Sequence, residues 1–241
     1  MNIFIAVLAA IIGYLLGSIS VARIMARLFL PGEDITTTTL QIPGADDKFE
    51  MTSVSATSLS LREGPRIGCT TSILDMLKVA LPTLAFRLLF PETSAYFLIA
   101  AGAGVLGHNF PIYHRFVGGR GITAVWGGLF VIDWLAVPIT TVLGTILGLA
   151  AKDVLLAYSG GILLLIPLMW LRFQSWEFVA YALFVNGMYW WAMWPDLVKY
   201  LEFKRAGKAD DMIAVLEQTD MGRGLKYMRK YGLIKDKKED A

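Results

Sequence analysis

Charge and cysteine are both scarce in this chain of 241 residues. Charged residues make up 17% of it, whereas a soluble domain carries roughly a quarter. Hydrophobic residues make up 56%, and the mean hydropathy is +0.56. This balance predicts an integral membrane protein. The single cysteine, Cys69, excludes a disulfide framework, and the two histidines, His108 and His114, are six residues apart rather than on one helix face. Neither histidine has a nearby cysteine or acidic residue, so we expect no metal, and we expect no cofactor and no nucleic-acid partner. The formal net charge of only +2 says little about partners.

Long apolar runs predict an all-α, polytopic helix bundle. A helix needs roughly 20 residues to cross the hydrocarbon of a bilayer. The first run lacks the basic start of a signal peptide, so we read it as a spanning helix. We expect a very tight turn at Asp133, Trp134 and Pro138 between the fourth and fifth spans. About seven spans are predicted, with six or eight as alternatives, near residues 3–28, 69–90, 94–113, 122–136, 137–151, 154–171 and 176–194.

Loop charges predict the orientation of these spans. Arg87 and Arg172 are the basic residues on one side, whereas the other side holds many more. The positive-inside rule makes the richer side cytoplasmic, with the N-terminus outside and the C-terminus inside. We therefore expect a transmembrane domain over 1–198, with an inserted polar loop at 31–68, and a cytoplasmic amphipathic tail over 199–241 that lies on membrane lipids.

A polar stretch lies between two of the apolar runs. It reads Gly107-His108-Asn109-Phe110-Pro111, followed by Gly118-Gly119-Arg120-Gly121. Polar groups at such a depth usually line a cavity or a substrate site. Glycine N–H groups can converge on an anion, and the run from Ile122 supplies a helix N-terminus that favours phosphate. The stretch predicts an anion-binding loop. As alternatives, the glycines could form only a flexible turn, and His108 could make only a structural hydrogen bond.

Three further polar residues lie in the predicted spans. Asp75 and Lys78 are three residues apart, hence on one helical face. They fit either a pair that neutralises itself or charges that line a cavity. Ser159 stands near a helix start, where a hydrolytic nucleophile would also need a base within hydrogen-bond reach. No base is evident, and no Asp follows either histidine at the spacing of soluble acyltransferases.

These residues resemble the acyl-phosphate-dependent glycerol-3-phosphate acyltransferases of bacteria, a family of seven-span membrane enzymes. Residues 107–127 are similar to the family's pattern GHxFPxFxxFxGGKGVATxxG, with Arg120 where lysine is usual. Residues 53–58 resemble its NxGATN segment and keep Ala56 and Thr57. Residues 74–78 resemble its LDxLK run. The resemblance covers about residues 10 to 170.

The resemblance implies an activity and a set of site residues. Such enzymes transfer a fatty acyl group from acyl phosphate to the 1-hydroxyl of glycerol 3-phosphate, giving lysophosphatidate for phospholipid biosynthesis in the bacterial cell membrane. A substrate phosphate is thought to help deprotonate the hydroxyl. Arg120 and the backbone of Gly118, Gly119 and Gly121 would bind phosphate, and His108 would shape or polarise the pocket. The further candidates are Ser159, Arg62, Thr57 and Ser58 for substrate contact, with Asp75 and Lys78 supporting the site.

Several positions depart from the family's pattern. The serine of the first motif falls at Met51, its later arginine at Leu61, and the serines of the third motif near Leu155 and Tyr158. Ser159 is then a substitute shifted by one position. The departures define an alternative from another class, a catalytically silent relative that binds a phosphorylated lipid precursor or a partner protein. A transporter would need polar residues at the midplane of several helices, and these spans have few.

Overall fold

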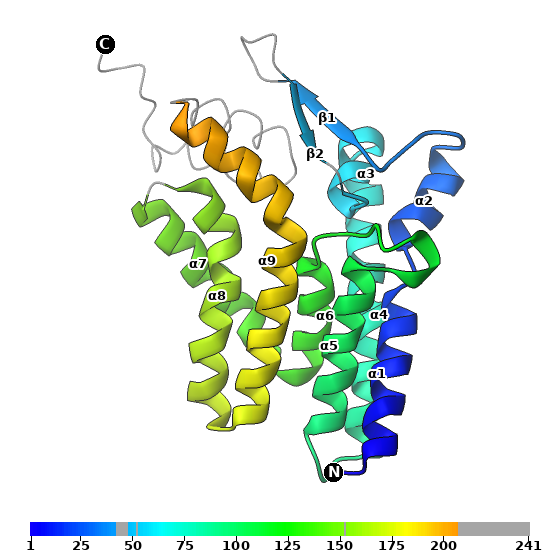
Figure 1. Ribbon diagram of the computed structural model, residues 1–241, viewed down its shortest axis with the longest axis vertical. Helices are drawn as coiled ribbons and strands as arrows, with labels where there is room; N and C mark the ends of the chain where they lie inside the picture. Colours follow the sequence, from blue (N-terminus) through cyan, green and yellow to red (C-terminus); the bar gives the residue numbers. More distant parts are fainter. Residues whose placement is uncertain (42–47, 52, 152, 207–241) are drawn as a thin grey trace. The chain divides into compact units, whose positions relative to one another are not determined.

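The chain folds into two compact units of mainly helical structure. A computed structural model describes residues 1–41, 48–51, 53–151 and 153–206 (Figure 1). The first unit comprises Met1–Val21 and Thr71–Met193. The second unit comprises Ala22–Thr70 and the chain from Trp194 onward.

Among the described residues, one apolar helix lies in each of the seven predicted spans. The all-α prediction is confirmed, because each predicted apolar run contains one of these helices. α4 begins in the second unit and α9 ends there. The seven are α1 (Ile3–Gly17), α4 (Pro65–Leu89), α5 (Ala95–Asn109), α6 (Ile122–Ile132), α7 (Ala136–Ala151), α8 (Val154–Phe173) and α9 (Trp176–Arg205).

The apolar surface of these helices suits a bilayer. Within the described residues, three helical runs are long and apolar enough to span it, namely Ile3–Phe29, Ala95–His114 and Leu155–Phe173, and Ile122–Ile132 and Ala136–Ala151 are shorter apolar helices. Large apolar side chains face outward on several of them, including Leu88 and Leu171, about 70% exposed. Hydrocarbon rather than water is the solvent that such a surface fits.

The structure divides the first predicted span into two helices. α1 ends at Gly17, and α2 (Val21–Phe29) begins after a short break. At the break the Ser18 N–H donates to the Tyr14 carbonyl (2.9 Å), and the Ile19 N–H donates to the Leu16 carbonyl (3.2 Å). The second bond spans three residues instead of four, which narrows the last turn and ends the helix. Hydropathy alone does not predict this end of the helix.

A tight turn joins α6 to α7, as predicted. The Asp133 N–H donates to the Leu129 carbonyl (2.7 Å), and the Asp133 carboxylate accepts from the Leu135 N–H (3.3 Å) and from Arg172 (3.0 Å). Pro138 lies in the first turn of α7 rather than in the connection. Proline is tolerated there because a first-turn N–H has no partner within the helix.

Glycines bring α1 and α5 into direct backbone contact. A Cβ added at Gly13 would overlap the Ala100 carbonyl, and one at Gly17 would overlap the Gly104 carbonyl. Small residues at a helix interface are how membrane helices approach closely. The Tyr14 hydroxyl also donates to the Phe110 carbonyl (3.0 Å), just beyond the end of α5. The start of the predicted anion loop is therefore held by α1.

The second unit contains structure that the predicted polar loop 31–68 did not include. β1 (Thr38–Gln41) and β2 (Lys48–Met51) pair antiparallel, with Thr38 opposite Met51. α3 (Ala56–Glu63) follows, capped by the Ser55 hydroxyl, which accepts from the Ser58 N–H (3.2 Å). α9 runs through the predicted domain boundary at 198, and residues 207–241 of the predicted tail lie outside the described residues.

Candidate functional site

The predicted anion loop folds back over the end of its own helix. After α5 the chain makes a short 3-10 helix, η1 (Ile112–His114), and then two residues with positive φ, Arg115 (52°) and Phe116 (62°). The Phe116 N–H donates to the Pro111 carbonyl (3.0 Å). The chain then returns so that the Gly119 N–H donates to the His108 carbonyl (3.2 Å).

The glycines of this loop are packed against His108 and Asn109. A Cβ at Gly118 would overlap the His108 carbonyl oxygen, and one at Gly119 would overlap the His108 Nε2 atom. Gly121 has a φ of 92°, and a Cβ there would overlap the Asn109 side-chain oxygen. The loop is therefore a fitted segment rather than a loose turn, since only glycine fits at these positions.

A buried charge cluster holds the other side of His108. Its Nδ1 atom lies 3.5 Å from Asp75 Oδ1, and Lys78 Nζ lies 2.8 Å from the same oxygen. The three side chains are at most 8% exposed. Lys78 Nζ also donates to the Ile19 carbonyl (2.7 Å), just beyond the end of α1. Asp75 and Lys78 thus form a pair and also contact the predicted site.

This cluster orients the imidazole ring. A neighbouring carboxylate usually binds one ring nitrogen of a histidine and thereby selects its tautomer. Here the Nδ1 side faces Asp75 and the Nε2 side faces Gly119. His108 therefore links the charges of α4 to the glycine loop.

α9 holds the loop from a third direction. Arg120 donates to the Ala192 carbonyl (2.6 Å), and the Asn109 side-chain amide donates to the Met188 carbonyl (3.1 Å). Met188 and Ala192 are four residues apart, hence on one face of the helix. Two consecutive turns of α9 therefore anchor the cation and the end of α5.

Ser159 meets the same stretch of α9. Its hydroxyl lies 2.8 Å from the Tyr189 hydroxyl, and both residues are almost fully buried. Tyr189 comes three residues before Ala192, which binds Arg120, so the two predicted residues contact α9 within about one turn. Sequence reasoning missed Tyr189, because a tyrosine beside tryptophans near the end of an apolar run also suits a membrane interface.

Thr57, Ser58 and Arg62 lie on α3 in the second unit. The buried Ser58 hydroxyl donates to the Ser53 carbonyl (3.0 Å) and accepts from Thr38 (2.9 Å). Arg62 donates to the carbonyls of Asp34 (2.8 Å) and Thr37 (2.7 Å) and pairs with Glu33 (3.4 Å). The Ser58 contacts fasten α3 to β1 and to the chain after β2, and the Arg62 contacts fasten it to the segment before β1. A role in substrate binding stays a prediction.

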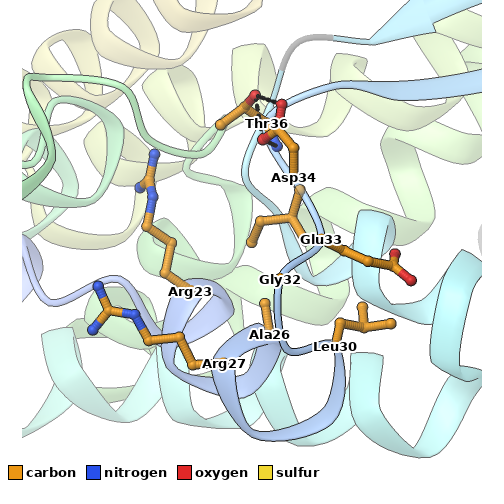
Figure 2. Close-up of a pocket in the computed structure, with 9 residues that line it drawn as sticks. Arg23, Ala26, Arg27, Leu30, Gly32, Glu33, Asp34 and Thr36 are labelled. Carbon is orange, nitrogen blue, oxygen red and sulfur yellow. Dashed lines mark hydrogen bonds between the residues drawn. The ribbon is translucent and has the colours of Figure 1, made fainter.

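Asp34 lies in the segment that Arg62 contacts. Hydrogen bonds from the Thr36 N–H and hydroxyl hold the pKa of Asp34 below its usual range (Figure 2).

In the part of the chain that the structure describes, no three His, Cys, Asp or Glu side chains gather as metal ligands would.

Comparison with known proteins points to one family. A sequence model described as "Glycerol-3-phosphate acyltransferase" matches residues 7–202. A glycerol-3-phosphate acyltransferase of Mycoplasmopsis synoviae is 29% identical over 79% of this chain and 82% of its own length. One from Dinoroseobacter shibae is 28% identical over 80% of this chain and 88% of its own.

Solved structures show a similar fold. Two crystal structures of PlsY, an integral membrane glycerol 3-phosphate acyltransferase, superpose with a TM-score of 0.67 at 21% identity. Each match covers 84% of this chain and 93% of the other. One is the lysophosphatidic acid form and the other the glycerol 3-phosphate form. The predicted membrane fold and acyltransferase activity are confirmed: this chain belongs to the glycerol-3-phosphate acyltransferase family.

Proposed function

We propose that this protein transfers a fatty acyl group from acyl phosphate to the 1-hydroxyl of glycerol 3-phosphate, giving lysophosphatidate and inorganic phosphate. The observation that carries the proposal is the fitted glycine loop, which connects Arg120, bonded to the Ala192 carbonyl of α9, with the buried cluster of His108, Asp75 and Lys78. The names of the relatives support the acceptor, and the family resemblance supports the donor.

Phosphate binding falls to Arg120 and the glycine backbone. Arginine carries a planar fork of N–H donors that matches phosphate oxygens, and the bond to the Ala192 carbonyl fixes the position of the Arg120 guanidinium. α6 begins at Ile122, directly after Gly121, and the N–H groups of its first turn favour an anion. Cation, loop and helix start thus supply positive potential from neighbouring residues.

His108 holds this arrangement together. Its ring separates Asp75 from Gly119, so the position of the loop depends on the orientation of the ring. A charge-stabilising site works only when its donors are fixed before the reaction. Asp75 and Lys78 are accordingly positioning residues.

The transfer step needs little covalent help from the protein. The acceptor hydroxyl oxygen attacks the carbonyl carbon of acyl phosphate, a C–O bond forms, and the bond to the phosphate oxygen breaks. Inorganic phosphate leaves with the bonding electrons, and the hydroxyl proton passes to a phosphate oxygen. The protein orients both substrates and stabilises the charge on the carbonyl oxygen. Ser159, paired with Tyr189, would contact substrate beside Arg120.

The reaction would take place at the cytoplasmic face of the bacterial cell membrane. The positive-inside rule supports this side, with the N-terminus outside. Arg120 then binds the substrate phosphate at this face, while the acyl chain of the acyl phosphate stays in the bilayer. Thr57, Ser58 and Arg62 stay candidates for substrate contact, as the family resemblance implies.

Replacing Arg120 tests the proposal. In proteoliposomes supplied with acyl phosphate and glycerol 3-phosphate, Arg120→Ala is expected to lower kcat about 10²–10³-fold, by analogy with loss of a charge-stabilising donor. Arg120→Lys should keep much of the activity, because the charge remains. Arg66→Ala, at an exposed site on α4, is the matched control.

Two results would contradict the proposal. Undiminished turnover by Arg120→Ala would remove its phosphate role. Absence of lysophosphatidate with the wild-type protein, together with saturable binding of glycerol 3-phosphate, would identify the chain as a silent relative.

A further inference from the structure

Residues 112–117, which we name the apolar loop, join the end of α5 to the glycine loop. Figure 1 shows this segment in green, at the end of α5 that lies away from the N-terminus. Arg115 is exposed within it. The large apolar side chains of the segment are 48–58% exposed, namely Ile112, Tyr113, Phe116 and Val117. Apolar side chains gathered on a surface in this way mark contact with a partner or a membrane.

The length of α5 places the apolar loop at the edge of the hydrocarbon. α5 has 15 residues, which cover about 22 Å of the roughly 30 Å of hydrocarbon in a bilayer. The apolar run that is long enough to span extends past α5 through η1, as Ala95–His114. Trp191 of α9, 67% exposed, contacts the Phe110 ring at the base of the loop (5.6 Å between ring centroids). Exposed tryptophan is typical of the membrane interface, so both observations give the loop the same level.

The backbone of the apolar loop finds partners within the protein. The His114 and Phe116 N–H groups both donate to the Pro111 carbonyl (3.1 and 3.0 Å). The Ile112 N–H donates to the buried Ser18 hydroxyl (3.4 Å). Hydrocarbon offers no partner for a backbone N–H group, so a segment beside lipid needs such internal bonds.

The apolar loop is also tied to the glycine loop. Its chain leaves from His108 and returns at Gly119, whose N–H donates to the His108 carbonyl (3.2 Å). Arg115 and Phe116 make the return with positive φ, which is uncommon for bulky residues. Because both ends of the segment meet at His108, the depth of the apolar loop in a membrane sets the depth of the glycine loop.

We propose that the apolar loop inserts into the lipid leaflet at this end of α5 and thereby holds the glycine loop at the level of the lipid headgroups. Its apolar side chains lie among the upper acyl chains, and Arg115 lies at the lipid phosphates. Apolar side chains beside a cation are the composition of a segment that binds an anionic membrane surface. A membrane-borne acyl phosphate carries its phosphate at the same level, and this last step alone rests on the proposed function.

Spin labelling measures the depth of the loop in the full-length protein. A nitroxide is attached to Phe116→Cys in a Cys69→Ser background, which removes the only native cysteine. The protein is placed in vesicles of phosphatidylcholine and phosphatidylglycerol. Oxygen concentrates in lipid and a nickel chelate stays in water, so the ratio of their collisions with the label reports its depth.

Two reference sites calibrate this ratio. Leu88→Cys, at a position 70% exposed on the apolar surface of α4, marks lipid. Glu63→Cys, at an exposed charged position that ends α3, marks water. We expect the ratio at position 116 to rise to that at position 88 and to lie well above that at position 63.

Kinetics test whether insertion positions the glycine loop. Phe116→Ser should raise the KM for membrane-borne acyl phosphate about tenfold, as expected for withdrawing one large apolar side chain from lipid, and should leave the KM for soluble glycerol 3-phosphate unchanged. Phe116→Leu keeps an apolar side chain and should keep both KM values. Phe4→Ser, the same substitution at a position 73% exposed near the start of α1, is the matched control and should change neither.

Each arm has a result that overturns its part of the proposal. A label at position 116 that meets the nickel chelate as freely as the label at position 63 overturns insertion, and so does a label shielded from both reagents, because protein would then cover the loop. Unchanged KM values, or an equal rise in both, overturn the positioning role. The label needs no turnover, so an inserted loop in an inactive protein would count against the proposed acyl transfer and not against insertion.

Discussion

Substituting Asp75 by Asn should separate the two roles of the buried cluster. The change removes the negative charge that Lys78 faces at 2.8 Å and that His108 faces at 3.5 Å. Lys78 keeps its bond to the Ile19 carbonyl, but its charge stays buried without a counter-ion. Breaking a buried pair on one side costs about 3–5 kcal/mol. For a chain of this length that corresponds to a loss of roughly 6–20 °C in Tm.

The double variant Asp75→Asn/Lys78→Met supplies the control. It removes both charges, and replacing a whole buried pair is often neutral for stability. We therefore expect its Tm to return toward wild type. Its acyl transfer should stay low, because His108 still lacks the carboxylate that orients it. The measurements are thermal unfolding in detergent and turnover in proteoliposomes.

Three outcomes would refute this reasoning. An unchanged Tm in Asp75→Asn would show that the Lys78 charge is not buried against the carboxylate. A double variant as unstable as the single one would show that packing, not charge, holds the helices there. Full turnover in either variant would show that Asp75 does not position His108.

Three further predictions concern the loop, α9 and the second unit. Gly119→Ala should destabilise the protein by about 1–3 kcal/mol and abolish most acyl transfer, since the new methyl group overlaps the His108 imidazole. Gly187→Ala, which places its methyl group in open space, should change neither property. Thermal unfolding and turnover are the measurements. Ser159→Ala and Tyr189→Phe should each lower kcat/KM, and the combined variant should cost no more than either alone, because both break one hydrogen bond. The lowered pKa of Asp34 adds local stability at a pH above the usual carboxyl pKa of about 3.9, and this stability is lost as the pH falls through the lower pKa of the folded state. Hydrogen-exchange protection of the neighbouring backbone should therefore fall in acid. Asp34→Asn should remove this pH dependence.

Predictability differed between the two units for physical reasons. Apolar runs and the spacing of Asp75 and Lys78 are local signals, and the structure places both as expected. The loop motif could be predicted because histidine and arginine are costly inside a membrane unless they form a site. The glycines beside them allow the backbone to come close to a ligand. The contact of His108 with Asp75 could not be predicted from the sequence, since it depends on how α4 packs against α5.

The missed features depend on longer-range packing. The run of threonines at 36–39 looked like a polar loop, but its last two residues enter β1, which pairs with β2. Threonine is β-branched and favours strands when a partner is present. Tyr189 was missed because a tyrosine near tryptophans suits a membrane interface, whereas here its hydroxyl faces Ser159 inside the bundle.

The backbone contact between α1 and α5 sets an order for biogenesis. Tyr14 and Phe110, which are joined across these helices, are separated by 96 residues in the chain. At about 5–20 residues per second, a ribosome takes roughly 5–20 s to make that length. α1 must therefore wait in the membrane with Gly13 and Gly17 uncovered while three later helices emerge. Its glycines pack only when α5 arrives, so the glycine loop that follows α5 cannot be set in place before nearly half of the chain has been made.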